Sequence, residues 1–330
     1  MFAAAAVANT GPLAVDTPER GAVRFALDQD SFAFSGPSLR HVVTAPELLM
    51  NTLRSILLHV DASPRSAVRL QLARELGLQH EKVVTALYAV PSSYLTQPFA
   101  FAEGAGAVLP LLEQIDTDRR VAAKALFDRE QRPRAPATCW ADVGTEPALE
   151  GFIAQALFAD LMVLGQRNAS DPLADGMPAD FVESVLIASG KPAIIVPYTG
   201  AFMSVGRDVL IAWKPTRECA RAVACALPLL QRARNVHVVG WTADATPRQA
   251  GRLDLAGYLR LHGVQADVQH HGTASVEGDA GEGLLSLAAD LQADLLVMGC
   301  YGHSRARELV LGGASRTILR SMTLPVLMAH

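Results

Sequence analysis

The sequence predicts an α/β protein that consists of two tandem, doubly wound parallel-sheet domains. Two observations support this fold class: short apolar runs alternate with helical patterns, and the same order of elements occurs twice along the chain. A third is a glycine-rich stretch that directly follows an apolar run near the C-terminus. Continuous apolar strands joined by helices are typical of parallel sheets covered on both faces, and right-handed crossovers build them into an open sandwich.

Length and composition are consistent with two domains and sizeable apolar cores. The chain has 330 residues, half of them hydrophobic, and a typical domain has ~150 residues. Its formal net charge of −4, without a run of lysines or arginines, gives no reason to expect a nucleic-acid or anionic membrane surface. No segment approaches the ~20 apolar residues that cross a bilayer. We therefore expect a cytoplasmic protein with no nucleic-acid partner and no membrane partner.

The N-terminal segment differs from the rest of the chain. Residues 1–49 show little periodicity and are interrupted by Gly, Pro and Asp, whereas the first convincing strand begins just after Met50. The apolar start lacks the basic residues that open a secretory signal peptide. We expect either a disordered extension at 1–49 or a mis-assigned start, with Met50 as the natural first residue.

An internal duplication organises the remainder of the chain. An apolar strand at 53–61 is followed by a polar turn and a helical pattern, and the same succession begins at 207–214. Residues 159–165 parallel residues 293–299, because both contain an Ala-Asp pair before an apolar run that ends in glycine. Each half closes on a further apolar strand, and these strands are expected at 191–196 and 324–328.

Helical patterns connect these strands. A linker near Pro197–Gly206 separates a first domain, expected at 50–199, from a second at 206–330. The first half carries extra residues, and the stretch from Pro91 to about Pro110 is their expected location because it lacks strong periodicity. Helices are expected at Ser66–Leu76, Val121–Arg129, Ala220–Arg232 and Gln249–His262.

The most informative motif is the glycine-rich stretch between an apolar run and the last helical pattern. Gly299 and Gly302 allow the chain to turn sharply where the strand ends. Gly312 and Gly313, with Ser315, lie where the helix begins. Free N–H groups, the helix dipole and a hydroxyl can receive phosphate oxygens there. A nucleotide site is therefore expected, and the alternative is a glycine-rich turn that only packs tightly.

This spacing resembles the nucleotide loop of the universal stress protein family, which reads Gly, two residues, Gly, nine residues, Gly, then Ser or Thr. Gly299, Gly302 and Gly312 match at the right intervals. Gly313 departs from the pattern, because many nucleotide-binding members have a hydroxyl residue there, and Ser315 keeps a hydroxyl two positions later. The resemblance implies a Rossmann-like, adenine nucleotide α-hydrolase-like fold. It also implies an adenine nucleotide ligand such as ATP, with or without Mg²⁺.

The resemblance also bears on how the two halves meet. Universal stress proteins occur as single domains that dimerise and as tandem chains, and the last strand of each domain commonly pairs across the dimer. By that resemblance, Ile194–Val196 pairs with Val326–Met328 and the chain forms an internal pseudo-dimer. The alternative is a pair of ordinary edge strands, although an uncovered apolar edge favours aggregation. Assembly of two chains into a homodimer stays open.

The first half is expected to lack a working phosphate loop. It keeps Gly165, but it has Asn168, Ala179, Asp180 and Val182 at the other loop positions. A carboxylate at Asp180 repels a phosphate placed at that helix start. The first half is therefore not expected to hold a nucleoside triphosphate through this loop.

The acidic residue that contacts adenosine in family members shows the opposite asymmetry. After its first strand the first half has Asp61, whereas the second half has Lys214. Lys214 either approaches a phosphate as a mobile charge or is solvated outside the pocket. Trp213 and Trp241, at or near strand ends, either border an adenine or pack in the core. One nucleotide site is expected, in the second half, from Trp213, Lys214, Pro215, Met298, Gly299, Gly302, His303, Arg305, Gly312, Gly313, Ala314 and Ser315.

Whether this site is catalytic stays open. A nucleotide hydrolase needs a positioned water and charge stabilisation, usually with Mg²⁺. His303 and Arg305 supply a titratable and a cationic group, but the loop has no evident carboxylate to bind a metal. We expect a non-enzymatic, nucleotide-responsive stress or regulatory protein that acts on an unidentified protein partner. The alternatives are a slow ATP hydrolase on the same fold, or a scaffold with a vestigial pocket.

Overall fold

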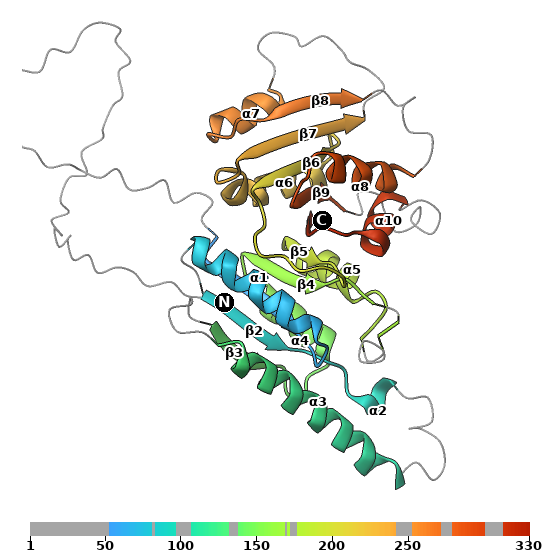
Figure 1. Ribbon diagram of the computed structural model, residues 1–330. Helices are drawn as coiled ribbons and strands as arrows, with labels where there is room; N and C mark the ends of the chain where they lie inside the picture. Colours follow the sequence, from blue (N-terminus) through green and yellow to red (C-terminus); the bar gives the residue numbers. More distant parts are fainter. Residues whose placement is uncertain are drawn as a thin grey trace, which may run out of the picture. The chain divides into compact units, whose positions relative to one another are not determined.

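The computed structural model describes most of the chain from residue 53 onward. The described residues are 53–80, 83–96, 107–131, 138–168, 170–171, 177–241, 253–271, 279–300 and 313–330. The extension expected at residues 1–49 lies outside them. Residues 49–330 form one unit in which strands and helices alternate (Figure 1).

The first half, residues 53–196, alternates strands with helices as predicted for a doubly wound domain. Its strands are β1 (Ser55–Val60), β2 (Val83–Tyr88), β3 (Thr138–Asp142), β4 (Leu161–Gly165) and β5 (Ala193–Val196). Its helices are α1 (Arg65–His80), α2 (Ser93–Thr96), α3 (Leu109–Arg129), α4 (Ala148–Ala156) and α5 (Phe181–Ser189).

The second half, residues 208–330, repeats this succession. Its strands are β6 (Asp208–Trp213), β7 (Asn235–Trp241), β8 (Asp267–His271), β9 (Leu295–Gly299) and β10 (Val326–Ala329). Its helices are α6 (Arg217–Leu230), α7 (Leu255–Leu261), α8 (Ala280–Asp290) and α10 (Gly313–Ser321).

All ten strands of the described residues join one sheet in the order β3-β2-β1-β4-β5-β10-β9-β6-β7-β8 (Figure 1). Neighbouring strands run parallel except β5 and β10, which pair antiparallel with Ile194 opposite Leu327. The predicted pairing of the two closing strands is therefore confirmed. It covers the apolar edge that each half would otherwise expose.

The register of the sheet makes the two halves directly comparable. Ile56 of β1 lies opposite Leu161 of β4, and Val209 of β6 lies opposite Leu295 of β9. Both pairs occupy the same place in the strand order of their half. Two residues, one from each half, are called equivalent when they lie the same number of residues along the chain from the matching member of these pairs.

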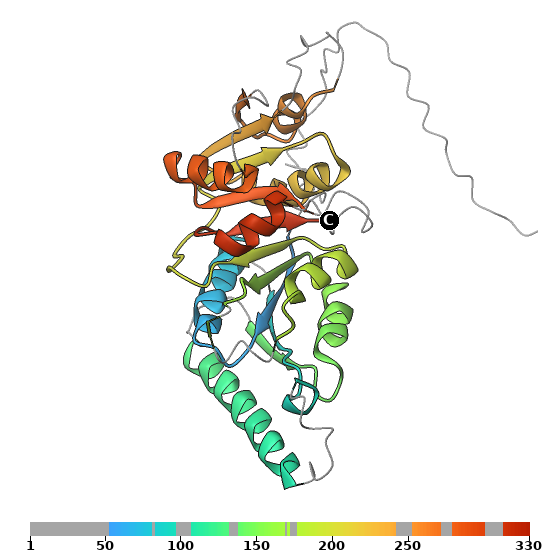
Figure 2. The ribbon, with the colours of Figure 1, turned by 90° about the vertical axis from the view of Figure 1, so that its right-hand side faces the viewer.

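Helices cover both faces of the sheet, and strand alternation supplies a core to each (Figure 2). Ile56, Leu58 and Val60 of β1 pack with apolar residues of α1 and α3, in a core that also includes residues of α6 and α7. Leu57, between them in sequence, belongs to the core on the other face, with residues of α4, α5, α8 and α10. Strands buried on both sides are the reason for the continuous apolar runs in the sequence.

The repeated Ala-Asp pair has the same structural task in both halves. The carboxylate of Asp160 accepts hydrogen bonds from the N–H groups of Arg54 and Ser55, at 2.8 and 3.0 Å. The carboxylate of Asp294 accepts from Arg207 and Asp208, at 2.9 and 3.1 Å. Each aspartate precedes the fourth strand of its half and satisfies backbone donors where the first strand begins.

All four predicted helices are present with different bounds, and the start differs most in two of them. The helix expected at Val121–Arg129 begins at Leu109, with Pro110 in its first turn, where a missing N–H breaks no helical hydrogen bond. Part of the stretch from Pro91 to Pro110 therefore belongs to α2 and α3. The helix expected at Gln249–His262 begins at Leu255 instead, because Asp254 caps it by accepting from the Gly257 N–H at 2.6 Å.

Candidate functional site

The predicted second-half site is centred on the carboxyl ends of β6 and β9. These ends lie side by side, because Ala212 of β6 pairs with Met298 of β9. The next residue of each strand, Trp213 or Gly299, is the last one in its strand. From β6 the chain adds β7 and β8 on one side of the sheet and then β9 and β10 on the other, so the strand order switches between β6 and β9. Ligands of open α/β sheets bind outside the carboxyl ends of the strands at such a switch point.

The other predicted residues of this site are only partly described. Lys214 and Pro215 follow β6 and are exposed, whereas Met298 is buried. Gly313, Ala314 and Ser315 are the first residues of α10, so the predicted helix start is correct. The remaining loop residues of the prediction lie outside the described residues: Gly302, His303, Arg305 and Gly312.

Packing against neighbouring residues explains why position 213 is a tryptophan and position 299 a glycine. Trp213 is half-buried and packs against the core that includes α6 residues. A Cβ on Gly299 would lie 2.5 Å from the backbone nitrogen of Cys219 and 2.6 Å from the carbonyl carbon of Glu218. The first turn of α6 thus lies directly against the end of β9, and only glycine permits this approach.

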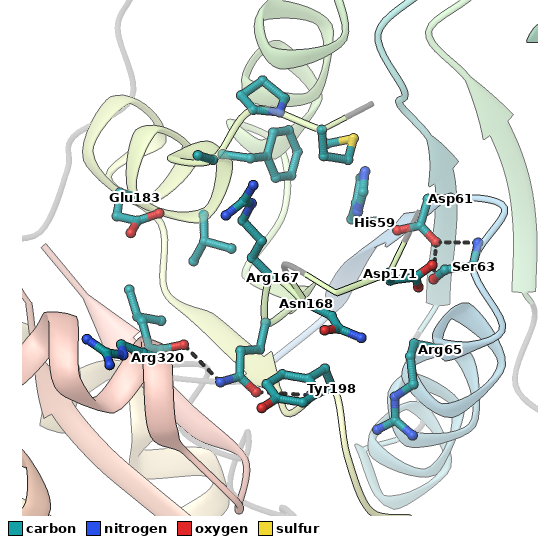
Figure 3. A pocket seen from close by; sticks show the side chains of 18 of the residues that line it. His59, Asp61, Ser63, Arg65, Arg167, Asn168, Asp171, Glu183, Tyr198 and Arg320 are labelled. Atoms are coloured by element: carbon teal, nitrogen blue, oxygen red, sulfur yellow. Dashed lines mark hydrogen bonds between the residues drawn. The ribbon is translucent and has the colours of Figure 1, made fainter. Parts of the chain in front are cut away.

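A cavity lies at the equivalent place in the first half, at the carboxyl ends of β1 and β4. We call it the first-half pocket. Its volume is about 540 Å³, and it is lined by the end of β1, the following turn, the end of β4, the start of α5 and part of α10 (Figure 3). His59, Asp61, Ser63 and Gly165 belong to its lining. This volume lies within the range typical of small-molecule pockets.

The carboxylate of Asp61 is saturated by its own neighbours. Its Oδ1 accepts hydrogen bonds from the Ser63 N–H at 2.9 Å, the Ser63 hydroxyl at 2.5 Å and the Ser66 hydroxyl at 2.8 Å. Its Oδ2 forms an ion pair with Nη2 of Arg69 at 2.9 Å. Burial acts to raise the pKa of Asp61, but Arg69 and the serine hydrogen bonds outweigh it and hold that pKa well below its ordinary value. Asp61 is therefore ionised and locked in place.

His59 forms a neutral wall beside this ion pair. Its Nε2–H donates to the carbonyl oxygen of Ala89 at 2.9 Å, and its ring lies against the rings of Phe152 and Phe181. Because the side chain is fully buried, desolvation lowers the pKa of His59 to about 4. At neutral pH the imidazole carries no charge.

The second half also contributes to the first-half pocket. Arg316, Leu319 and Arg320 of α10 line it, and Figure 3 shows Arg320 on the opposite side from His59 and Asp61. The buried amide of Gln166 donates to the carbonyl of Leu319 at 2.9 Å and accepts from the Tyr198 N–H at 3.0 Å. The β5–β10 pairing thus brings a helix of one half into the pocket of the other.

Comparison with known proteins shows which protein family the second half matches. The family model described as "Universal stress protein family" matches residues 207–330. Residues 207–330 are a universal stress protein domain. The curated protein "Universal stress protein Slr1230" from Synechocystis sp. (strain ATCC 27184 / PCC 6803 / Kazusa) is 28% identical over 172 residues. That match covers 51% of this chain and 57% of the relative, so the chain spans little more than half of the relative's length.

Solved structures of universal stress proteins share the fold. A universal stress protein from Archaeoglobus fulgidus DSM 4304 aligns with a TM-score of 0.57 and 17% identity, over 83% of this chain and 95% of that chain. Another match is a universal stress protein in complex with cAMP, with a TM-score of 0.28 and 18% identity, over 38% of this chain and 97% of that chain.

The first-half pocket contains residues that sequence reasoning missed. Asp61 is flanked in the sequence by three further polar residues of the pocket, His59, Ser63 and Arg69. This polar cluster at the end of the first strand could have indicated a site. Arg316 and Arg320 had no such signal, because nothing local relates α10 to the first half. In the part of the chain that the structure describes, no group of three or more His, Cys, Asp or Glu side chains is arranged to hold a metal ion. None of the described helices is long and apolar enough to span a membrane.

Proposed function

We propose that this protein is a nucleotide-responsive regulatory protein with one adenine-nucleotide site in its universal stress protein domain. The observation that carries the proposal is the placement of the two described ends of the glycine motif. Gly299 ends β9 at the switch point, and Gly313 begins α10 on the far side of residues 301–312, which lie outside the described residues. The motif therefore connects a strand end to a helix N-terminus, which is the arrangement that binds phosphate in dinucleotide folds.

The described start of α10 is compatible with a bound phosphate. A Cβ on Gly313 would meet no described atom within 4 Å, so none of the described residues occupies the space at this helix start. The first turn of α10 contains no acidic residue. By contrast, Asp180 precedes α5 in the first half and Glu183 lies in its first turn. A phosphate is thus favoured at α10 and disfavoured at α5.

The proposed role is regulatory rather than catalytic. Lys214 is exposed beside the site and offers a mobile positive charge to a phosphate, with or without Mg²⁺. We propose that the two halves form an internal pseudo-dimer through β5 and β10, and that nucleotide occupancy alters a surface recognised by a protein partner. The antiparallel β5–β10 pairing and the mirrored strand order support the pseudo-dimer.

A binding experiment on the full chain tests the proposal. Native mass spectrometry of freshly purified protein and calorimetry with ATP, with and without Mg²⁺, should show one nucleotide per chain. Gly313→Asp should abolish binding without unfolding, since no described atom lies within 4 Å of its Cβ and its charge repels phosphate. Leu253→Asp is the matched control, because it adds the same charge at a position that is 97% exposed and outside the site.

Three outcomes separate the functions. Intact ATP that co-purifies and is lost in Gly313→Asp supports the regulatory role. Accumulation of ADP over time would reassign the site to slow hydrolysis. Failure of the wild-type protein to bind ATP would overturn the proposal and leave a scaffold.

A further inference from the structure

Helix α3 is much longer than its counterpart in the second half. It lies between the second and third strands of the first half and has 21 residues, whereas α7, between β7 and β8, has seven. Only Leu112, Ala123 and Phe127 of α3 are buried, and of these Ala123 and Phe127 belong to the core of the sheet. Figure 2 shows the first turns of α3 extending beyond the strands. Covering the sheet therefore uses only a small part of this helix.

The side of α3 away from its buried residues carries a stripe of exposed side chains. Val121 is 62% exposed, and Ala122 and Ala125 are exposed as well. Asp118 and Arg129 lie one turn before and one turn after these three, and both are exposed. Residues three, four or seven positions apart share one side of a helix, so the five residues form a continuous surface. We call it the α3 face.

The charges of the α3 face are complementary to each other. The carboxylate of Asp118 accepts a hydrogen bond from the Gln114 amide at 2.7 Å, and it forms no ion pair among the described residues. The side chain of Arg129 is 71% exposed and lies 3.7 Å from the carboxylate of Glu130. An acidic residue at one end of the face and a basic residue at the other make the face complementary to a second copy that runs in the opposite direction.

Other charged side chains of α3 already have partners within the chain. Nζ of Lys124 lies 2.6 Å from the carboxylate of Asp128, and Nε of Arg120 lies 2.8 Å from that of Asp142. The exposed charges of the α3 face are therefore those best placed to meet another molecule.

An antiparallel pair of α3 helices about a two-fold axis places the small residues of the face at its centre. When Asp118 lies opposite Arg129 of a second copy, Ala122 lies opposite Ala125, because each alanine is four residues inside the charged pair. Small side chains at the crossing point allow two helices to approach closely. Symmetry repeats every contact, so this arrangement contains two ion pairs.

We propose that the α3 face is the interface of a homodimer in which two copies of this chain pair through α3 in antiparallel orientation. Ala122 and Ala125 meet at the two-fold axis, Val121 adds apolar area, and two ion pairs between Asp118 and Arg129 flank them. One helix face per chain is small beside the ~1,600 Å² of a standard interface, so the dimer is reversible and depends on concentration. This surface lies in the first half, and its role does not depend on the nucleotide site proposed in the second.

Sedimentation velocity at a series of protein concentrations tests the proposal on the full chain. The wild-type protein should show a monomer–dimer equilibrium that shifts toward monomer as salt concentration rises. Asp118→Arg and Arg129→Asp should each raise the dimer Kd about tenfold or more, because each change turns two attractions into repulsions. The variant with both changes should dimerise again, because its charges are only exchanged. Glu113→Arg is the matched control, since it reverses an exposed carboxylate of α3 outside the α3 face.

Chemical cross-linking shows whether α3 itself forms the contact. In a Cys139→Ser background, which lacks an exposed native thiol, a short bis-maleimide reagent should link two copies of Ala122→Cys. Glu113→Cys should not be linked, because the antiparallel pairing separates the two copies of position 113 by ~30 Å along the helices. Thermal unfolding of every variant shows whether it is folded.

The outcomes decide the proposal. Weaker dimers in the two single reversals, recovery in the double variant and a link at position 122 support it. A wild-type protein that stays monomeric at every concentration would overturn it. So would a dimer that is equally strong in folded Asp118→Arg and Arg129→Asp, or one that links at position 113 and not at position 122. Failure of the exchanged charges to restore the dimer would reject the antiparallel pairing.

Discussion

The carboxyl ends of β1 and β6 occupy equivalent positions in the sheet, but the charged residues that follow them have opposite signs. After β1, Asp61 is largely but not fully buried and is bound to Arg69 and two serines. After β6, Lys214 is exposed, and the position equivalent to Arg69 is Ala222. One half uses the position for an internal ion pair, and the other leaves a charge in solvent. The two halves therefore share a strand order but differ in the chemistry at their strand ends.

The largest expected effect comes from breaking the buried pair. Arg69→Met leaves the Asp61 carboxylate buried without its cation, and we expect the free energy of unfolding to fall by about 3–5 kcal/mol. Lys214→Met, in the other half, should change it by no more than about 0.5 kcal/mol because the side chain is exposed. Urea denaturation of both variants measures the contrast. Equal effects would show that the two strand ends are not as different as the structure indicates.

The pH dependence of stability provides the next contrast. Burial lowers the pKa of His59 to about 4, whereas the unfolded chain binds a proton at this residue near pH 6.5. Between these values the unfolded state binds more protons, so the free energy of unfolding falls as the pH decreases through this window, by up to about 3 kcal/mol. The lowered pKa of Asp61 adds a loss only below about pH 4.

Substitution of the histidine tests that assignment. His59→Gln should remove most of the loss between pH 6.5 and pH 4, measured by urea denaturation at a series of pH values. His262→Gln replaces an exposed histidine of the second half and should leave the profile unchanged. An unaltered profile in His59→Gln would place the acid sensitivity elsewhere.

The two strand-end glycines give a third comparison, with expected costs of about 1–3 kcal/mol from overpacking. A Cβ on Gly299 would collide with the backbone of α6, so no nearby side chain can relieve it. A Cβ on Gly165 would collide with Nη1 of Arg69, the end of a flexible side chain. The added cost of Gly165→Ala should therefore shrink in the Arg69→Met background, whereas that of Gly299→Ala should not. A double-mutant cycle measures this coupling, and additive costs at Gly165 would contradict it.

These comparisons also show how far the sequence alone could lead. Apolar runs located β1, β4, β5, β6, β9 and β10 within a few residues, because strands buried on both faces consist mostly of apolar residues. The motif correctly located Gly299 at a strand end and Gly313 at a helix start. The helix ends were less predictable, since single capping residues such as Asp254 decide them.

The first-half pocket was beyond the reach of sequence patterns. Local periodicity shows which face of α10 is apolar, but not which half its arginines approach. That depends on the antiparallel register of two four-residue strands, in which Leu327 meets Ile194. Gln166 and Leu319 are likewise 153 residues apart in the chain and meet only across this junction. The remaining loop residues of the second-half site lie outside the described residues, so their roles stay predictions.

The smallest expected effect concerns the junction itself, where the halves again differ. Gln166 links α10 to Tyr198 by two hydrogen bonds, and its equivalent in the second half is Cys300, whose shorter side chain has no amide. Gln166→Met should lower the free energy of unfolding by about 1 kcal/mol, because both partners lie where water can partly replace the amide. Gln114→Met, which removes an exposed amide on α3, should have no measurable effect. Hydrogen exchange gives the specific readout: the Tyr198 amide should exchange faster in Gln166→Met, and unchanged protection would mean that the glutamine does not tie the two halves together.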